Sequence, residues 1–489
     1  MRVLLIYPNI IETPKDISMG LACVSAMLKQ NGHTVDLIDT TWGITNEEII
    51  AKATAFNPEV LCITVATNDF KYGMSIIDMI KEKYPNAPVV VGGYHATMAP
   101  QEVLDHKTVD MVCVGEGDSA ITEVVEMIQK GEKKTDILNI WFKDRENNKT
   151  ISNVQRQLPQ MNDLPIPDRT IFDYQRYVDW HNGTATFVST RGCPYPCTYC
   201  INRKQKEIYS GMGAFVRYKS VDNILAEIKG VVDRYHIKEV GFNDDTFTLN
   251  FTRVKEFCTK YPEVIGNVPF YINARVNCVS KELFLHLAKA GCVRVNMGVE
   301  CGSPKLRNEL LERDMTDEEI IQTFHWAREA GIQTYAFNMI GLPYETKEDI
   351  QMTIELNRKI DPDYLGCSIF TALPGTPLYD LCKKNGWLAD EYSTSYFQDS
   401  NMIHPNFTVA ELKKIRDSFG YNVYKANRPF RAFADVFDKS MIKFDPYVRV
   451  RSQLIKLGIK VFIKRKKDKN IELPEIVGKP KPFQGVDLG

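Results

Sequence analysis

The sequence predicts an α/β protein, because short apolar runs alternate with helix-like segments along most of its 489 residues. Before residue 135 the apolar runs are nearly continuous, as in strands that are buried on both faces. Strands of this kind joined by helices indicate a doubly wound, Rossmann-like parallel sheet with helices on both sides. The expected strands are 3–7, 35–38, 60–65, 89–91 and 111–114, and the expected helices are 19–30, 46–56, 71–83 and 118–130.

A second series of strand and helix segments begins at Thr184. Six strand–helix units in succession indicate a partial, open-sided (β/α)6 barrel, in which ligands meet the carboxyl ends of the strands. After the stretch 187–189, the expected strands are 239–242, 270–274, 293–297, 334–340 and 364–370, and the expected helices are 221–235, 251–260, 280–290, 316–330 and 347–359. Beyond about residue 400 the pattern of 412–437 predicts a mainly helical C-terminal region.

Two short stretches separate the first sheet from the barrel. Residues 139–153 are predicted to form a hairpin that turns at Glu146, and the stretch 158–168 is interrupted by prolines and has no periodicity. We therefore expect four parts, namely a sheet domain at 1–135, a hairpin and linker at 136–183, the barrel at 184–385, and the helical C-terminal region at 386–489.

The cysteine spacing and the apolar runs of the sequence indicate the cellular compartment. The twelve cysteines are not spaced as a disulfide framework, so reduced thiols in the cytoplasm are expected. No run of about 20 apolar residues occurs, so no membrane span is expected.

The net charge of −1 hides an asymmetry, because residues 439–469 carry eleven Lys or Arg against two Asp. This segment places Lys456, Lys460, Lys464 and Lys467 on one helical face, which predicts peripheral contact with an anionic membrane through the basic tail. A solvated helix that lies on the acidic remainder of the protein is the alternative. No nucleic-acid partner is expected.

Cys193, Cys197 and Cys200 are the one closely spaced group of thiols in the sequence, in the pattern Cys-x3-Cys-x2-Cys. Gly192 and the two prolines of this stretch suit a tight loop, because glycine relaxes the backbone and proline fixes it. A structural zinc site needs four protein ligands, whereas an iron–sulfur cluster held by three cysteines keeps one iron free for a ligand that is not protein. A zinc site completed by a distant Cys or His is the alternative.

The cysteine motif, with Tyr199 just before its last cysteine, resembles that of the radical SAM superfamily. The resemblance implies a [4Fe–4S] cluster whose open iron binds S-adenosylmethionine (SAM), and an electron donor such as flavodoxin or ferredoxin. The resemblance also implies roles for residues at the strand ends of the barrel. Asp244 and Asp245 stand where the family binds the SAM amino group, with helix capping as the alternative.

Four further strand ends of the barrel carry candidates, and the same resemblance implies the roles of two of them, Glu300 and the turn at Gly341. Glu300 is expected to accept hydrogen bonds from the SAM ribose or from the methionyl amine. The turn at Ile340 and Gly341 is expected to contact the adenine. Arg275 and Glu300 are the catalytic candidates, and Arg275 and the turn 374–376 are expected to shape the substrate site.

The stretches Gly92-Gly93-Tyr94-His95 and Gly115-Glu116-Gly117-Asp118 resemble the cobalamin-binding domain of cobalamin-dependent radical SAM enzymes. Glycines directly after a strand let a ligand approach the backbone, and an ordinary turn is the alternative. Asn68 and Asp69 stand where the family's loop faces the cobalt, with a helix cap as the alternative. The implied cobalamin-binding residues are Asn68, Asp69, Gly92, Gly93, His95, Gly115, Glu116 and Gly117.

One departure from many cobalamin enzymes concerns the lower face of the cobalt. The pattern Asp-x-His-x-x-Gly, whose His ligates cobalt in those enzymes, is absent, and the nearest text runs from Asp36 to Gly43. Base-off cobalamin without a His ligand is therefore expected.

Together the resemblances imply an enzyme that uses the cluster, SAM and cobalamin to methylate an unactivated carbon of an organic substrate. Two alternatives stay open. One is an enzyme of the same architecture that forms a ring or oxidises its substrate, a lipid or a tetrapyrrole among the candidates. The other is a cobalamin-binding or metal-binding regulatory protein without turnover, against which the acids beside the cysteine motif count. The sequence does not name the substrate.

Overall fold

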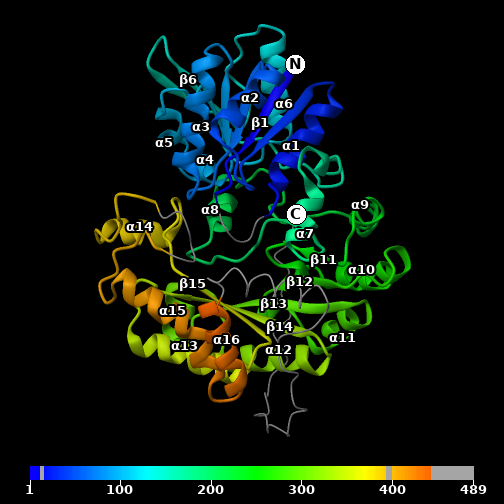
Figure 1. Ribbon diagram of the computed structural model, residues 1–489, viewed down its shortest axis with the longest axis vertical. Coiled ribbons are helices and arrows are strands. Elements are labelled where there is room, and N and C mark those ends of the chain that lie inside the picture. The colour runs from blue at the N-terminus through cyan, green and yellow to red at the C-terminus, as the bar shows by residue number, and fades with distance from the viewer. Residues whose placement is uncertain (11–15, 393–398, 442–489) are drawn as a thin grey trace. The chain divides into compact units, whose positions relative to one another are not determined.

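The computed structural model describes residues 1–10, 16–392 and 399–441. These residues form two compact units, each with its own large sheet (Figure 1). Unit 1 comprises Met1–Gly183, Val188–Ile237 and the described part of Ala372–Ser395. Unit 2 comprises Thr184–Phe187, Lys238–Thr371 and the described residues from 399 onward. Each unit is therefore assembled from segments that are distant in the sequence.

Unit 1 contains a seven-stranded sheet in the order β2-β1-β3-β4-β5-β6-β7, in which β1 to β5 are parallel. This arrangement confirms the predicted doubly wound sheet. The strands are β1 (Arg2–Tyr7), β2 (Thr34–Asp39), β3 (Val60–Thr64), β4 (Val89–Gly92), β5 (Met111–Cys113), β6 (Ile140–Asp144) and β7 (Lys149–Ile151). The helices are α1 (Met19–Gln30), α2 (Asn46–Phe56), α3 (Phe70–Lys83), α4 (Tyr94–Met98), α5 (Pro100–Asp105) and α6 (Asp118–Gln129).

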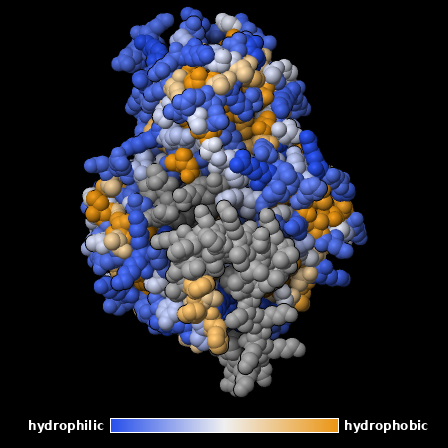
Figure 2. All heavy atoms as spheres, viewed as in Figure 1, coloured by the Kyte–Doolittle hydropathy of each residue, from blue (hydrophilic) through white to orange (hydrophobic). Residues whose placement is uncertain are grey.

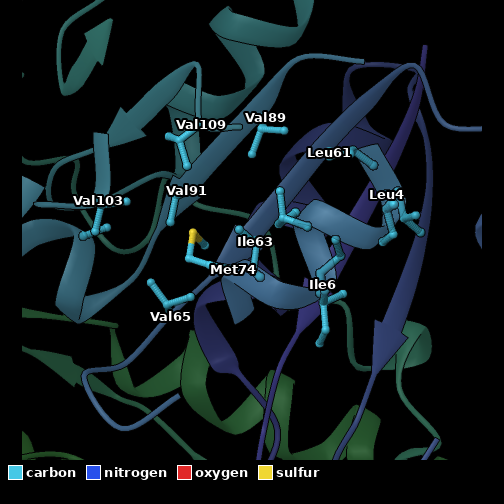
Figure 3. Close-up of a cluster of buried hydrophobic side chains, with 14 of the residues drawn as sticks. Leu4, Ile6, Leu61, Ile63, Val65, Met74, Val89, Val91, Val103 and Val109 are labelled. Atoms are coloured by element: carbon cyan, nitrogen blue, oxygen red, sulfur yellow. The ribbon is translucent and has the colours of Figure 1, made fainter. Parts of the chain in front are cut away.

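Alternate strand residues of this sheet face the helices α2 to α5. Figure 3 shows Leu4, Ile6, Leu61 and Ile63 in one cluster of buried side chains with Met74 of α3, which lies next to Ile63. α1 and α6 pack against each other, and Figure 1 shows them on the other side of the sheet. The buried strands thus lie between two helical layers, and their carboxyl-terminal loops remain at one edge of the sheet.

The hairpin predicted at 139–153 is present, and it is part of the sheet. β6 pairs antiparallel with β5, and β7 pairs antiparallel with β6. The pairing covers the edge of β5, whose backbone groups would otherwise be open, and it buries Ile140 and Phe142. The short helices α4 and α5 were not predicted, because one or two turns do not establish a hydrophobic period.

Unit 1 also contains the segments that surround the cysteine motif. The short strands β9 (Thr190–Arg191) and β10 (Arg217–Tyr218) form an antiparallel pair. The remaining elements are η1 (Arg169–Ile171), α7 (Tyr174–Trp180), α8 (Ile201–Ile208), α9 (Val221–Arg234) and α14 (Pro377–Lys384).

Unit 2 contains a six-stranded, fully parallel sheet in the order β15-β14-β13-β12-β11-β8, which confirms the predicted partial barrel. Its strands are β8 (Thr184–Phe187), β11 (Glu239–Phe242), β12 (Phe270–Ala274), β13 (Cys292–Glu300), β14 (Gln333–Ile340) and β15 (Tyr364–Ile369). Its helices are η2 (Phe247–Leu249), α10 (Phe251–Val264), η3 (Val276–Cys278), α11 (Lys281–Lys289), η4 (Leu306–Leu310), α12 (Asp317–Glu329) and α13 (Lys347–Ile360).

Two C-terminal helices, α15 (Val409–Tyr424) and α16 (Pro429–Met441), complete the described part of unit 2. Leu412 and Phe419 of α15 join the core formed by Ile340 and Ile369 at the ends of β14 and β15. The predicted basic face of the tail lies outside the described residues. Across the residues that the structure describes, no helix combines the length and apolar character needed to cross a bilayer.

Candidate cofactor-binding sites

The three cysteines of the motif lie in one loop of unit 1, between β9 and α8. Cys197 is buried, whereas Cys193 and Cys200 are half-buried. Gly192 begins the loop with a φ of 87°, and a Cβ at this position would collide with the carbonyl oxygen of Phe215. The backbone N–H of Cys200 donates to the carbonyl of Cys197 at 3.1 Å, which closes a turn between the last two thiols.

Polar groups of α8 support the cysteine loop. The Nδ2 of Asn202 lies 3.6 Å from the Sγ of Cys200 and donates to it, and Arg203 donates to the carbonyl of Pro196 at 3.0 Å. Hydrogen bonds to sulfur are one means by which a protein tunes an iron–sulfur cluster, so the donor set fits such a cluster. Among the described residues, no group of three or more His, Cys, Asp or Glu side chains is arranged to hold a single metal ion.

In unit 1, Asn68 occupies the loop between β3 and α3. Its side chain is buried, and neither Oδ1 nor Nδ2 has a hydrogen-bond partner in the protein. A buried amide without partners costs about 1–3 kcal/mol, which a ligand that bonds to it would offset. Asn68 therefore fits a ligand site at this strand end, where the resemblance placed the cobalamin.

Asp69 follows Asn68 and is the N-cap residue of α3, but its side chain makes no capping hydrogen bond. Its Oδ1 instead accepts from the backbone N–H of Ala66 at 2.7 Å and closes the loop before the helix. Burial raises the pKa of this carboxyl to about 7. The structure thus shows Asp69 as a loop-closing residue, and the alternative that its side chain caps the helix does not hold.

His95 lies in the first turn of α4, and its side chain is fully buried. Its Nδ1 is 3.3 Å from the Oγ1 of Thr67, so the fold brings His95 to the same loop as Asn68. The imidazole packs 4.4 Å from the ring of Phe70 and 5.3 Å from that of Tyr392. Burial lowers its pKa to about 4, so the ring is neutral at neutral pH.

Gly92 is the last residue of β4 and Gly93 follows it, but the two glycines differ in what surrounds them. A Cβ at Gly93 would lie 2.5 Å from the carbonyl oxygen of Val65, and its φ of 98° disfavours any other residue. A Cβ at Gly92 would meet only the Cβ of Cys113, at 3.8 Å. The close contacts of Gly93 with the end of β3 therefore require glycine there. No contact within the protein requires glycine at position 92, so a ligand can approach the backbone of Gly92.

Gly115 and Glu116 lie in the loop between β5 and α6, where Gly115 packs so closely on Tyr209 that a Cβ would collide with its hydroxyl. Glu116 accepts hydrogen bonds from Arg191 at 2.9 Å and from Arg217. Two residues of the expected cofactor-binding loop 115–117 thus contact Tyr209, Arg191 and Arg217, and these contacts were not predicted from the sequence. The cofactor role of this loop stays a prediction.

In unit 2, the acidic pair after β11 is split by burial, because Asp244 is fully buried and Asp245 is exposed. Asn273 on β12 donates to the carbonyl of Asp244 at 3.1 Å, which fixes the backbone at this strand end. Asp244 is thus the member of the pair that is removed from solvent. Both residues stay predicted ligands of the SAM amino group.

The two catalytic candidates of unit 2 lie near Arg313, which the sequence reasoning missed. Glu300 ends β13 with a left-handed φ of 64°, at a register shift of the strand, and its Oε1 is 3.5 Å from Nη1 of Arg313. A non-glycine residue in this conformation is strained, and such strain clusters at functional sites. The guanidinium of Arg275 donates to the Oδ1 of Asn277 and to the carbonyl of Arg313. The catalytic roles of Arg275 and Glu300 stay predictions.

The turn after β14 is held by a buried carboxyl group. Oε2 of Glu345 accepts from the backbone N–H groups of Gly341 at 2.5 Å and of Leu342 at 3.2 Å. Burial raises the pKa of Glu345 to about 8. His404 supports the same turn, because its Nε2 lies 2.7 Å from the carbonyl oxygen of Leu342. Ile340 packs in the core, so the backbone from Gly341 onward is the part of the turn left to meet an adenine.

Two family models match the chain, the radical SAM superfamily over residues 187–356 and the B12 binding domain over residues 16–125. The chain is 27% identical over 448 residues to an uncharacterized methyltransferase of Pyrococcus horikoshii, with 90% of this chain and 95% of that protein covered. It is 26% identical over 425 residues to the anaerobic magnesium-protoporphyrin IX monomethyl ester cyclase of Cereibacter sphaeroides, with 83% and 66% covered.

The fold is similar to that of a solved radical S-adenosylmethionine methyltransferase, TsrM from Kitasatospora setae, with cobalamin and a [4Fe-4S] cluster bound. The TM-score is 0.65 at 18% identity, with 78% of this chain and 75% of that chain covered. With both matched regions present, the chain belongs to the radical SAM superfamily. Its B12-binding domain makes it a cobalamin-dependent radical SAM enzyme.

Proposed function

We propose that this enzyme is a C-methyltransferase that uses a [4Fe–4S] cluster, SAM and cobalamin to methylate an unactivated carbon of an organic substrate. The observation that carries the proposal is that one chain joins a three-cysteine loop and a B12-binding sheet whose edge bears the unpartnered amide of Asn68. Similarity to a methyltransferase over 90% of the chain supports methyl transfer. When bound, the cofactors supply the electron, the organic radical and the methyl group.

The chain's own residues bind, orient and exclude water. Cys193, Cys197 and Cys200 would hold three irons of the cluster, and the hydrogen bond from Asn202 would lower the electron density on one sulfur. Glu345 holds the backbone of Gly341 and Leu342 in one conformation, which orients the turn proposed to contact the adenine.

In the B12-binding domain, the proposed cofactor contacts are the amide of Asn68, which lies in the 66–69 loop, and the neutral ring of His95, which lies beside that loop. A neutral imidazole can donate or accept one hydrogen bond at each ring nitrogen. In the barrel, Asp244 and Glu300 are proposed to bind the SAM amino and ribose groups.

The test of this function follows the methyl group of SAM. Cells fed methionine with a labelled methyl group are compared with and without the chain, and their extracts are analysed by mass spectrometry. We expect a compound that depends on the chain and that carries one labelled methyl group in place of a hydrogen of its precursor. A chain-dependent product that carries no label would contradict methyl transfer.

Ring formation is the second candidate, because the cyclase of Cereibacter sphaeroides is 26% identical over 83% of this chain. In the same extracts, ring formation would give an unlabelled product lighter than its precursor by two hydrogens. A reducing partner such as flavodoxin or ferredoxin is proposed for either chemistry, because the cluster must receive an electron.

Peripheral membrane contact is also proposed, and α16 supports it. Phe430, Phe433 and Phe437 are exposed by 77%, 70% and 46%, and their spacing places them on one helical face. Figure 2 shows apolar side chains over α16 on the surface of the molecule. The +9 segment 439–469 begins within this helix, so exposed aromatic rings lie next to cationic sequence, as in helices that bind anionic bilayers.

Vesicles of anionic lipid test the membrane contact. At low salt we expect the full chain to sediment with the vesicles, a chain ending at Phe437 to stay mostly free, and added salt to release the full chain, because screening weakens lysine–lipid attraction. The double variant Phe430→Ser with Phe433→Ser keeps the charge and is expected to bind less. Equal sedimentation of the full and shortened chains would rule the contact out.

A further inference from the structure

Two arginines and two carboxylates of unit 1 form a compact cluster, and Glu116 is its one member that the resemblance assigned to a cofactor. Arg191 on β9 and Arg217 on β10 are register partners across the antiparallel pair. Both guanidinium groups bind Glu116, and Nη1 of Arg191 also lies 2.9 Å from Oδ2 of Asp118, while its Nη2 lies 3.1 Å from Oδ1. We call these four residues the arginine clamp.

The arginine clamp is largely removed from solvent. The side chain of Arg217 is 3% exposed and that of Asp118 is 7% exposed. Burial alone would raise the pKa of Asp118, but the pairing with Arg191 holds it below its ordinary value. Bidentate pairs of this kind fix orientation as well as charge, because the planar guanidinium matches two carboxylate oxygens at once.

The two halves of the clamp come from different matched regions of the chain. Glu116 and Asp118 lie between β5 and α6, within the B12-binding match, whereas Arg191 lies within the radical SAM match, two residues before Cys193. Gly192, which separates Arg191 from Cys193, is held against the backbone of Phe215. Because only Gly192 separates them and its backbone is constrained, a displacement of Arg191 would also displace Cys193.

We propose that the arginine clamp positions the cysteine loop on the B12-binding sheet, so that Arg191, Arg217, Glu116 and Asp118 are positioning residues for the iron–sulfur cluster. Glu116, which the resemblance placed at the cobalamin, acts in this role through the two arginines. The proposal rests on the cluster of the proposed function. A purely stabilising ion-pair network would not need to be anchored next to the first cysteine.

The test compares variants in the anaerobically reconstituted full chain. Arg191→Lys keeps the charge but cannot bind both carboxylates in the same planar geometry, and Glu116→Gln removes the shared acceptor charge. Glu227→Gln is the matched control, because Glu227 is also a buried carboxylate with two cationic partners, Arg169 at 2.8 Å and Lys219, neither of them on β9. The readouts are the rate of iron release to a chelator and the electron paramagnetic resonance spectrum of the reduced cluster.

We expect both clamp variants to release iron about tenfold faster than the wild type and to alter the spectrum, as loss of supporting contacts around metal ligands does, with the control at the wild-type rate. Wild-type release from Arg191→Lys would overturn the proposal, and so would equal acceleration in Glu227→Gln, which would indicate general destabilisation. If Glu116→Gln does not fold, Arg191→Lys decides. Absence of any cluster from the wild type would instead contradict the proposed function.

Discussion

Replacing Cys193, Cys197 and Cys200 together by alanine is expected to leave the protein without a cluster. The reconstituted wild type should hold about four irons and four sulfides per chain, and the variant close to none, because the remaining cysteines have no cluster spacing. Iron and sulfide analysis with visible absorbance measures the difference. Cleavage of SAM under reducing conditions should disappear with the cluster.

A matched control separates this effect from general thiol loss. Cys278 and Cys367 are half-buried, as Cys193 and Cys200 are, and neither lies in the 193–200 loop. Their double replacement by alanine is expected to leave the iron content unchanged. A full cluster in the triple variant would show that the assignment of the three ligands is wrong.

Gly92→Val is expected to abolish corrinoid binding while leaving the fold intact. The new Cβ would meet only Cys113, at an ordinary contact distance of 3.8 Å, so the protein itself has room for it. A ligand lying on the end of β4 would lose its closest approach to the backbone. Equilibrium dialysis against cobalamin measures the affinity, and thermal unfolding checks the fold.

Gly93→Ala is the comparison variant, because it tests whether corrinoid binding is lost through damage to the fold. Its Cβ would press on the carbonyl of Val65 and its positive φ is unfavourable, so we expect a loss of about 1–3 kcal/mol of stability with or without corrinoid. A bulky residue at Gly93 would thus weaken cobalamin binding through the fold. Wild-type corrinoid affinity in Gly92→Val would remove β4 from the binding site.

A local cap marks the start of two helices whose first residues were predicted correctly. α1 and α2 begin where predicted because Ser18 and Thr45 accept hydrogen bonds from the first turn, and Thr45 forms a capping box with Glu48. The pairing of β6 with β5 was missed because strand pairing depends on which edge is open in space, which no local pattern records.

The candidate sites also divide into those marked by a local sequence pattern and those formed by residues distant in the sequence. The cysteine triad is a local pattern of eight residues, so spacing was sufficient to find it. The partners of Glu116 lie 75 and 101 residues away, at Arg191 and Arg217, and their convergence follows from packing alone. Glu345 had one local signal, its position four residues after Gly341, but that its side chain folds back onto the turn was not apparent from the sequence.

The central claim is that one chain holds both a three-cysteine cluster and a base-off corrinoid, and metal analysis of the anaerobically reconstituted wild type tests it most directly. We predict an iron to cobalt ratio of about four to one, with one corrinoid per chain. The cobalt electron paramagnetic resonance spectrum should show no nitrogen ligand other than those of the corrin ring, because the sequence lacks the cobalt-ligating His motif. A protein with full iron and no affinity for corrinoid, or with a nitrogen of the protein or of the cofactor's own base bound to cobalt, would contradict the account.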